Sequence, residues 1–265
     1  MKRLADKVLK TYTFFIIMIL YLPIAVLVVF SFNKVESIHR WGGFTLEWYK
    51  RLFTGQAFVS HSAALNVWEA FYNSIWVALV TGVISAILGV LLAYGISRFT
   101  FRGKDILEGL LYIPIIIPEI ASSLSLLLFY IWIRFPLGGW SVVIGHTTFS
   151  ISYCMVVIRT RFAGFDKSLE EAAKTLGADE IQTFLRITLP IIFPGILAAF
   201  LLTFTLSYDD FIKTAFTRGP GFLTLPILIW TWAKRGLISP ELNALATLSL
   251  SVSITLTYLY AKLQK

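Results

Sequence analysis

The segment SLEEAAKTLGADEIQTFLRITLP, residues 168–190, is the stretch that decides the architecture of this chain. It belongs to a polar insert, residues 159–186, and runs directly into a long apolar segment that starts at Ile187. Such an insert between apolar segments indicates a loop on one side of a membrane that the chain crosses repeatedly. Because residues 171–176 are good helix formers and the insert leads directly into Leu189-Pro190, we expect a structured docking element rather than a spacer.

The composition supports a membrane protein. Of 265 residues, 57% are hydrophobic and 14% are charged, and the mean hydropathy is +0.76. Soluble domains are about half apolar and about a quarter charged, whereas a spanning helix needs about 20 mostly apolar residues. Six segments qualify: 11–32, 71–94, 106–133, 140–158, 187–208 and about 242–260. We therefore expect an all-α membrane protein with six transmembrane helices, forming one membrane domain over residues 1–265.

The first apolar segment resembles a secretory signal, because four basic residues precede it. Its apolar run is too long for the hydrophobic region of a signal, and no small-x-small cleavage site follows at 31–34. We expect a retained helix. Cys154 is the only cysteine in the sequence, which excludes an internal disulfide.

The distribution of basic residues predicts the orientation. The net charge is +8. Segments 1–11, 96–105, 159–186 and 262–265 carry 14 Lys and Arg in 53 residues, and segments 33–70, 134–139 and 209–240 carry 9 in 76. The positive-inside rule places the first group in the cytoplasm, with both termini and the 159–190 loop. The basic charge thus sets topology and does not indicate a nucleic-acid partner.

Two further segments need a choice of structure. Hydroxyl residues alternate with apolar ones over 247–257, a strand-like pattern, but a lone strand cannot satisfy its backbone in lipid, so we expect a helix. In the second span, Ser85, Gly89 and Ala93 recur at four-residue steps. Small residues at this spacing favour close helix packing.

The loop itself reads as two short helices around a turn. Residues 171–176 favour a helix, and Gly177 tolerates the positive φ of a helix end. Asp179 is a suitable N-cap for a second helix over 180–186. Pro190 and Pro194 lie four apart and predict a kinked entry into the fifth span.

The spacing E-A-A, three residues, G, nine residues, I-x-L-P resembles the EAA loop of permease subunits in bacterial ABC importers. The resemblance implies the type I importer permease (MetI-like) fold, and it implies that Glu171, Ala172, Ala173 and Gly177 seat in a groove of a cytoplasmic ATPase. The remaining residues expected in the coupling loop are Glu170, Ile187, Leu189 and Pro190. The resemblance further implies that this subunit does not hydrolyse ATP and binds no cofactor, because ATP and Mg bind to the ATPase. The sequence contains no phosphate-binding G-x-x-x-x-G-K-[ST] motif.

The resemblance covers essentially the whole chain. Segments 207–210 (SYDD), 217–220 (TRGP) and 239–247 (SPELNALAT) are similar to the second permease of spermidine/putrescine importers. That family implies a bacterial inner-membrane importer with a second homologous permease, two ATPase copies and an extracytoplasmic substrate-binding protein. Membrane lipid is the remaining partner. Permeases for iron, sulfate and other solutes share the loop, so the identity of the transported solute is inferred only from these three less specific segments.

One acidic residue lies deep within a predicted span. Glu119 falls midway along 106–133, where a charge costs about 2.5–3.5 kcal/mol and should face a cavity or a partner. Ser122 and Ser123 follow on the same helix face, and Pro114 and Pro118 free backbone carbonyls nearby. This acceptor-rich patch suits an ammonium group. The alternative is a structural hydrogen bond to a neighbouring helix.

Asp209 and Asp210 lie at the outer end of the fifth span, where adjacent carboxylates repel unless a cation compensates. Lys213 is positioned to be that partner, so a salt-bridged helix end is an equal alternative to a substrate site. Trp48 offers an aromatic face for an ammonium. The leading hypothesis is import of a polyamine or similar cation along Glu119, Asp209 and Asp210.

His146 has no second ligand at metal-binding spacing and is expected to pack. Three other hypotheses remain open. They are a permease for ferric iron, another amine or an anion, a secondary transporter that uses Glu119 as a proton site, and a scaffold without a pathway.

Overall fold

The computed structural model describes residues 2–37, 40–55 and 67–264. Two compact units are present: Met1–Val67 with Leu228–Ser251, and Trp68–Ile227 with Val252–Lys265. The regular elements of the described residues are all helical: α1 Lys2–Phe30, α2 Glu47–Phe53, α3 Val67–Arg98, α4 Lys104–Ile116, α5 Glu119–Trp132, α6 Gly139–Ala163, α7 Ser168–Thr175, α8 Glu180–Thr183, η1 Phe184–Thr188, α9 Leu189–Tyr208, α10 Ile212–Thr217, α11 Leu225–Lys234 and α12 Pro240–Gln264. The predicted all-α class is confirmed.

In the first unit, the chain after α1 is organised by Asn33. Its side-chain amide donates to the carbonyls of Ser37 and Arg40, and its Oδ1 accepts from the Gly42 amide. Trp48, on α2, is 5% exposed and donates its indole N–H to the Asn33 carbonyl at 2.6 Å. Residues 56–66 of the first predicted outer loop lie outside the described part of the chain.

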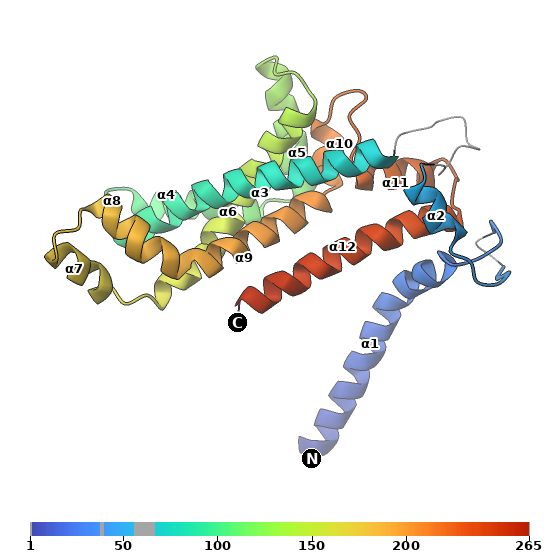
Figure 1. Cartoon of the computed structure of the whole chain (residues 1–265), viewed down its shortest axis with the longest axis horizontal. Coiled ribbons are helices and arrows are strands. Elements are labelled where there is room, and N and C mark those ends of the chain that lie inside the picture. The colour runs from blue at the N-terminus through green and yellow to red at the C-terminus, as the bar shows by residue number, and fades with distance from the viewer. Residues whose placement is uncertain (1, 38–39, 56–66, 265) are drawn as a thin grey trace. The chain divides into compact units, whose positions relative to one another are not determined.

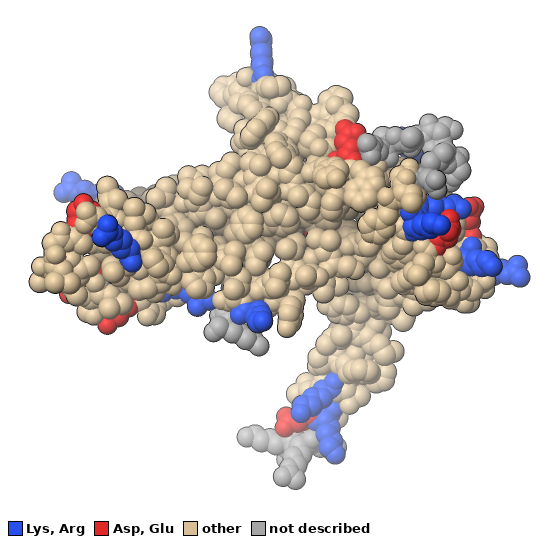
Figure 2. Space-filling model, viewed as in Figure 1, with Lys and Arg blue, Asp and Glu red and all other residues tan. Residues whose placement is uncertain are grey.

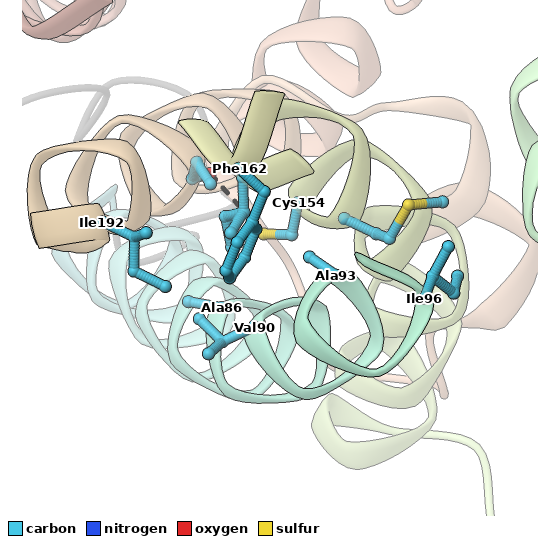
Figure 3. Packing of buried hydrophobic residues seen from close by; sticks show 10 residues of the cluster. Ala86, Val90, Ala93, Ile96, Cys154, Phe162 and Ile192 are labelled. Carbon is cyan, nitrogen blue, oxygen red and sulfur yellow. Dashed lines mark hydrogen bonds between the residues drawn. The ribbon is translucent and has the colours of Figure 1, made fainter. Parts of the chain in front are cut away.

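The core of the second unit lies between α3, α6 and α9, which run side by side (Figure 1). Figure 3 shows the apolar side chains that meet there. The buried members are Ala86, Val90, Ala93, Ile96, Cys154, Met155, Ile158, Phe162, Ile192 and Ala199. A Cβ on Gly89 would lie 2.5 Å from Cys154 Cβ. The small residues on α3 therefore allow α6 to approach closely, as their spacing predicts.

Within the described ranges, five helices are long and apolar enough to span a membrane, and the number rises to six if α4 and α5 together form one bent span. The two helices meet at 107°, which corrects the expectation of one continuous helix over 106–133. Pro118 explains the break, because a residue before proline avoids the α region. Ile117 is accordingly extended, with φ −66° and ψ 137°. Glu119 is thus the first residue of α5 rather than the middle of a helix.

The surface of the second unit matches a membrane-spanning body. In Figure 2 the flank along the middle of α3 and α9 shows no charge, whereas Lys, Arg, Asp and Glu gather at the end that carries α7 and α8. Residues 247–257 lie in α12, which confirms helix over strand.

Candidate functional site

The E-A-A segment forms α7, which begins with a local cap. The Asp166 Oδ1 accepts a hydrogen bond from the Ser168 backbone amide at 2.9 Å. Hydrogen bonds from the Ser168 backbone and side chain lower the pKa of Asp166. Glu171 and Ala172 are exposed on α7, and Ala173 is half-buried. The helix ends at Thr175, and the exposed Gly177 follows two residues later. Gly177 has φ +90°, the left-handed conformation that its position predicts.

Glu170 differs from its neighbour Glu171 because its carboxylate is turned inward. Its Oε2 lies 2.9 Å from Arg98 Nε at the end of α3, and its Oε1 accepts from Thr188 Oγ1 at 2.6 Å. The Arg98 guanidinium lies 4.7 Å from the Phe165 ring centroid and 5.3 Å from that of Phe162. We call Arg98, Glu170 and Thr188 the buried bridge, because it joins α7 to α3 and to η1.

The second half of the loop is more continuous than predicted. Asp179 caps α8 as expected, with its Oδ1 accepting from the Gln182 amide at 2.7 Å. The helix predicted over 180–186 is not separate, because α8 passes through the π-helical turn η1 into α9 without a break. Pro190 cannot donate the α-helical hydrogen bond, which favours an irregular turn just before it. Ile187 and Leu189 are half-buried and Pro190 is exposed.

The loop also presents apolar side chains outward. Leu176 is 89% exposed and Ile181 71%, and Leu169 and Leu185 are also exposed. Exposed apolar side chains on a polar loop are candidate contact points for a partner. We call these four residues the apolar loop face.

A cavity of 630 Å³ lies among α4, α5, α6, α9 and α10 of the second unit. This volume is in the range of small-molecule sites, about 300–1,000 Å³. Four of the residues that the sequence predicts for the substrate path line this cavity: Glu119, Ser122, Asp209 and Asp210. The sequence separates Glu119 from the aspartates by about ninety residues, and the bend at Pro118 and the turn before α10 bring them to one cavity.

Lys213 lies at the centre of this group. Its Nζ forms ion pairs with Glu119 Oε1 and with Asp210 Oδ2, the latter at 3.0 Å. It also lies 5.3 Å from the Phe149 ring centroid. The pairing of Lys213 with Asp210 was one predicted alternative, and it coexists with the cavity. Among these four ionisable side chains, three carboxylates face one lysine, which leaves an excess of negative charge.

Asp210 is held by more than the lysine. Its Oδ1 accepts the Thr214 amide at 2.9 Å and lies 3.3 Å from His146 Nε2. Burial alone would raise the pKa of Asp210, but His146, Lys213 and the Thr214 amide stabilise the carboxylate, so its pKa lies below the ordinary value. His146 also bonds Ser207 through Nδ1 at 2.7 Å, as expected of a packing histidine.

Of the remaining residues predicted to line the substrate path, some line the cavity and others do not. Ser122 and Ser123 both donate to the backbone carbonyl of Glu119, at 2.9 and 2.7 Å, and not to its carboxylate. Ser122 lines the cavity, while Ser123 is fully buried. The Asp209 Oδ1 accepts from Ser253 Oγ at 2.6 Å. Trp48 belongs to the first unit, where its indole holds the Asn33 carbonyl.

Sequence reasoning missed Arg98, Thr188 and Phe149. Arg98 ends an apolar helix and Thr188 lies among apolar neighbours, and neither position has a local signal of its long-range partner. Within the described ranges, no group of three or more His, Cys, Asp or Glu is arranged to hold a metal ion.

The family described as binding-protein-dependent transport system inner membrane component matches residues 85–265. The chain belongs to this family. It is similar to the spermidine/putrescine transport system permease protein PotC of Haemophilus influenzae, 36% identical over 94% of this chain and 93% of that protein. It is also similar to the putrescine transport system permease protein PotI of Escherichia coli K12, 36% identical over 93% and 88%.

Solved structures agree on the fold. A bacterial ABC transporter that imports the acidic polysaccharide alginate matches with a TM-score of 0.69, at 16% identity over 99% of this chain and 96% of that one. The MetNI methionine ABC transporter matches with a TM-score of 0.58, at 16% identity over 83% and 98%. The predicted type I importer fold is confirmed. This member of the family is a multi-pass inner-membrane permease subunit of an ABC importer and is not its ATPase. Membership of this family decides against the secondary-transporter hypothesis.

Proposed function

We propose that this permease imports polyamines, spermidine or putrescine, or a closely similar small organic cation. The observation that carries the proposal is the convergence of Glu119, Asp209 and Asp210 on one cavity with excess negative charge. Carboxylates that outnumber cations attract an ammonium group and repel an anion. The substrates of the PotC and PotI relatives have this chemistry.

The second part of the proposal is that residues 159–190 couple the permease to a cytoplasmic ATPase. Glu171, Ala172 and Gly177 are exposed where a partner can reach them, and the four residues of the apolar loop face are exposed on the same loop. The buried bridge ties α7 to the end of α3 and to η1, which continues directly into α9. A push on α7 would therefore reach two spanning helices through a rigid connection rather than through a flexible loop.

The proposed assembly contains this chain, a second homologous permease, two ATPase copies and an extracytoplasmic binding protein. The family description names a binding-protein-dependent system, and one matching alginate transporter was solved with its substrate-bound periplasmic protein. Both termini and the coupling loop would lie in the cytoplasm, with the whole chain acting as one permease. No cofactor is assigned to this chain, and ATP and Mg would be bound by the ATPase.

Reconstitution tests the substrate assignment. Proteoliposomes that carry the complete importer should take up labelled spermidine when ATP is supplied to the ATPase side. Unlabelled putrescine should compete, whereas sulfate and ferric iron should not. We expect Glu119→Gln and Asp209→Asn to reduce the rate about tenfold or more, the effect of losing one charge-assisted hydrogen bond.

Asp105→Asn is the matched control, because it removes an exposed carboxylate at the start of α4, away from the cavity lining. It should leave the uptake rate unchanged. Competition by sulfate or iron instead of putrescine, or equal loss in all three variants, would reject the polyamine assignment.

A further inference from the structure

The cavity already contains an ammonium group, that of Lys213. Its Nζ contacts carboxylates from two elements, Glu119 of α5 and Asp210 before α10, and lies over the face of Phe149 of α6. Two carboxylates and an aromatic face are the groups that recognise an ammonium ligand. The Lys213 side chain is 16% exposed and that of Asp210 5%, so this position is largely shielded from solvent.

We propose that Lys213 is a tethered competitor of the substrate, and that an ammonium of the incoming cation displaces it from the position formed by Glu119, Asp210 and Phe149. This inference rests on the proposed function, because it assigns one subsite of the same cavity. Lys213 thus keeps the carboxylates paired while the cavity has no substrate. It sets the threshold above which a cation enters.

The unequal environments of the two carboxylates indicate which contact is exchanged. Asp210 keeps the Thr214 amide and His146 when the lysine leaves. The Glu119 side chain is 45% exposed and lies at the first turn of α5, where the helix dipole partly stabilises a carboxylate. Release of Lys213 therefore leaves no deeply buried carboxylate without partners. Glu119 becomes the exposed acceptor that a substrate ammonium reaches first.

A tethered competitor lowers the apparent affinity by the fraction of sites it leaves open. If Lys213 fills the position for about 80–90% of the time, removing its charge lowers the apparent Kd about five- to tenfold. A purely structural ion-pair partner predicts the opposite, because its loss would disorder the cavity and weaken binding.

Equilibrium binding of labelled spermidine to the assembled permease pair and ATPase in nanodiscs, without binding protein, measures this directly. We expect both neutral variants, Lys213→Met and Lys213→Gln, to bind spermidine at least about fivefold more tightly than the wild type. Lys213→Arg keeps the charge and should remain within about twofold. Glu119→Gln combined with Lys213→Met should lose the gain. Unchanged or weaker binding in the neutral variants, or failure of both to assemble, overturns the proposal.

Propylammonium, which has a single ammonium group, separates this inference from the polyamine assignment. Its binding is read from the thermal stability of the same complexes and should increase in the neutral variants. If it does so while no variant binds spermidine, the subsite stands and the polyamine assignment fails. If the wild type binds spermidine and neither probe gains affinity in the neutral variants, the polyamine assignment stands and the competitor is rejected. No binding of either probe rejects both.

Discussion

Replacing Glu170 and Glu171 by glutamine, one at a time, tests the division of labour between two adjacent glutamates. Glu170→Gln removes the charge that pairs with Arg98 and weakens the contact with Thr188. Glu171→Gln changes an exposed carboxylate on the same turn of α7. The first change should destabilise the permease, and the second should weaken only its association with the ATPase.

The magnitude follows from burial. The Arg98 and Glu170 side chains are 8% and 12% exposed, so breaking their pair leaves a guanidinium that water reaches poorly. Loss of one member of a buried pair costs about 3–5 kcal/mol. Glutamine keeps the shape and one acceptor, which favours the lower end. At about 2–4 °C per kcal/mol for a chain of this size, Tm should fall by about 6–12 °C.

Thermal unfolding of the purified permease, followed by intrinsic tryptophan fluorescence, gives Tm for each variant, and copurification of the ATPase gives the association. Glu171→Gln should leave Tm within about 1 °C, as for a surface change. The double variant Glu170→Gln with Arg98→Met should recover part of the loss, since both charges are then removed. Equal Tm values for the two single variants would refute the structural role given to Glu170.

Three further predictions concern packing and the loop turn. Gly89→Ala should cost about 1–3 kcal/mol of unfolding free energy, because the new methyl group overpacks against Cys154. Gly95→Ala has open space at its Cβ and should be neutral or slightly stabilising. Thermal unfolding of both variants checks this, and a larger fall in Tm for Gly95→Ala than for Gly89→Ala would contradict it. Asp179→Ala should cost about 1 kcal/mol by removing the cap of α8, seen as faster amide hydrogen exchange over residues 180–183, and unchanged exchange would argue against the cap. Gly177→Ala forces φ +90° on a residue with a Cβ, which strains the loop by about 1 kcal/mol. The variant should therefore have lower spermidine-stimulated ATPase activity, whereas full activity would show that the turn tolerates another conformation.

Several features could be predicted because their signals are local. Apolar runs longer than a bilayer is thick predict the spanning helices, and a glycine or an aspartate at a helix end predicts the turn at Gly177 and the cap at Asp179. The alternation over 247–257 favoured a strand, but the bilayer permits only helices for a lone apolar segment, and α12 follows this rule. The break before Glu119 was missed, although Pro118 carries the signal.

The roles of charged residues required the tertiary structure. Glu170 and Glu171 are the same residue type at neighbouring positions, and only packing assigns one to Arg98 and the other to the surface. Lys213 was predicted to pair with the adjacent aspartates, and the structure adds Glu119, 94 positions away in sequence. No spacing rule connects residues on different helices, because their contact depends on helix ends, bends and crossing angles together.

The sequence by itself determined that this chain crosses the membrane as helices and carries an EAA-type loop, since hydropathy and turn chemistry act within about 20 residues. Only the tertiary structure decided that Glu119, Asp210 and Lys213 share one cavity and that Glu170 bridges α3 to η1. Ion pairs of this kind form where the folded backbone brings distant positions within a few ångströms, and the chain must fold before that proximity exists.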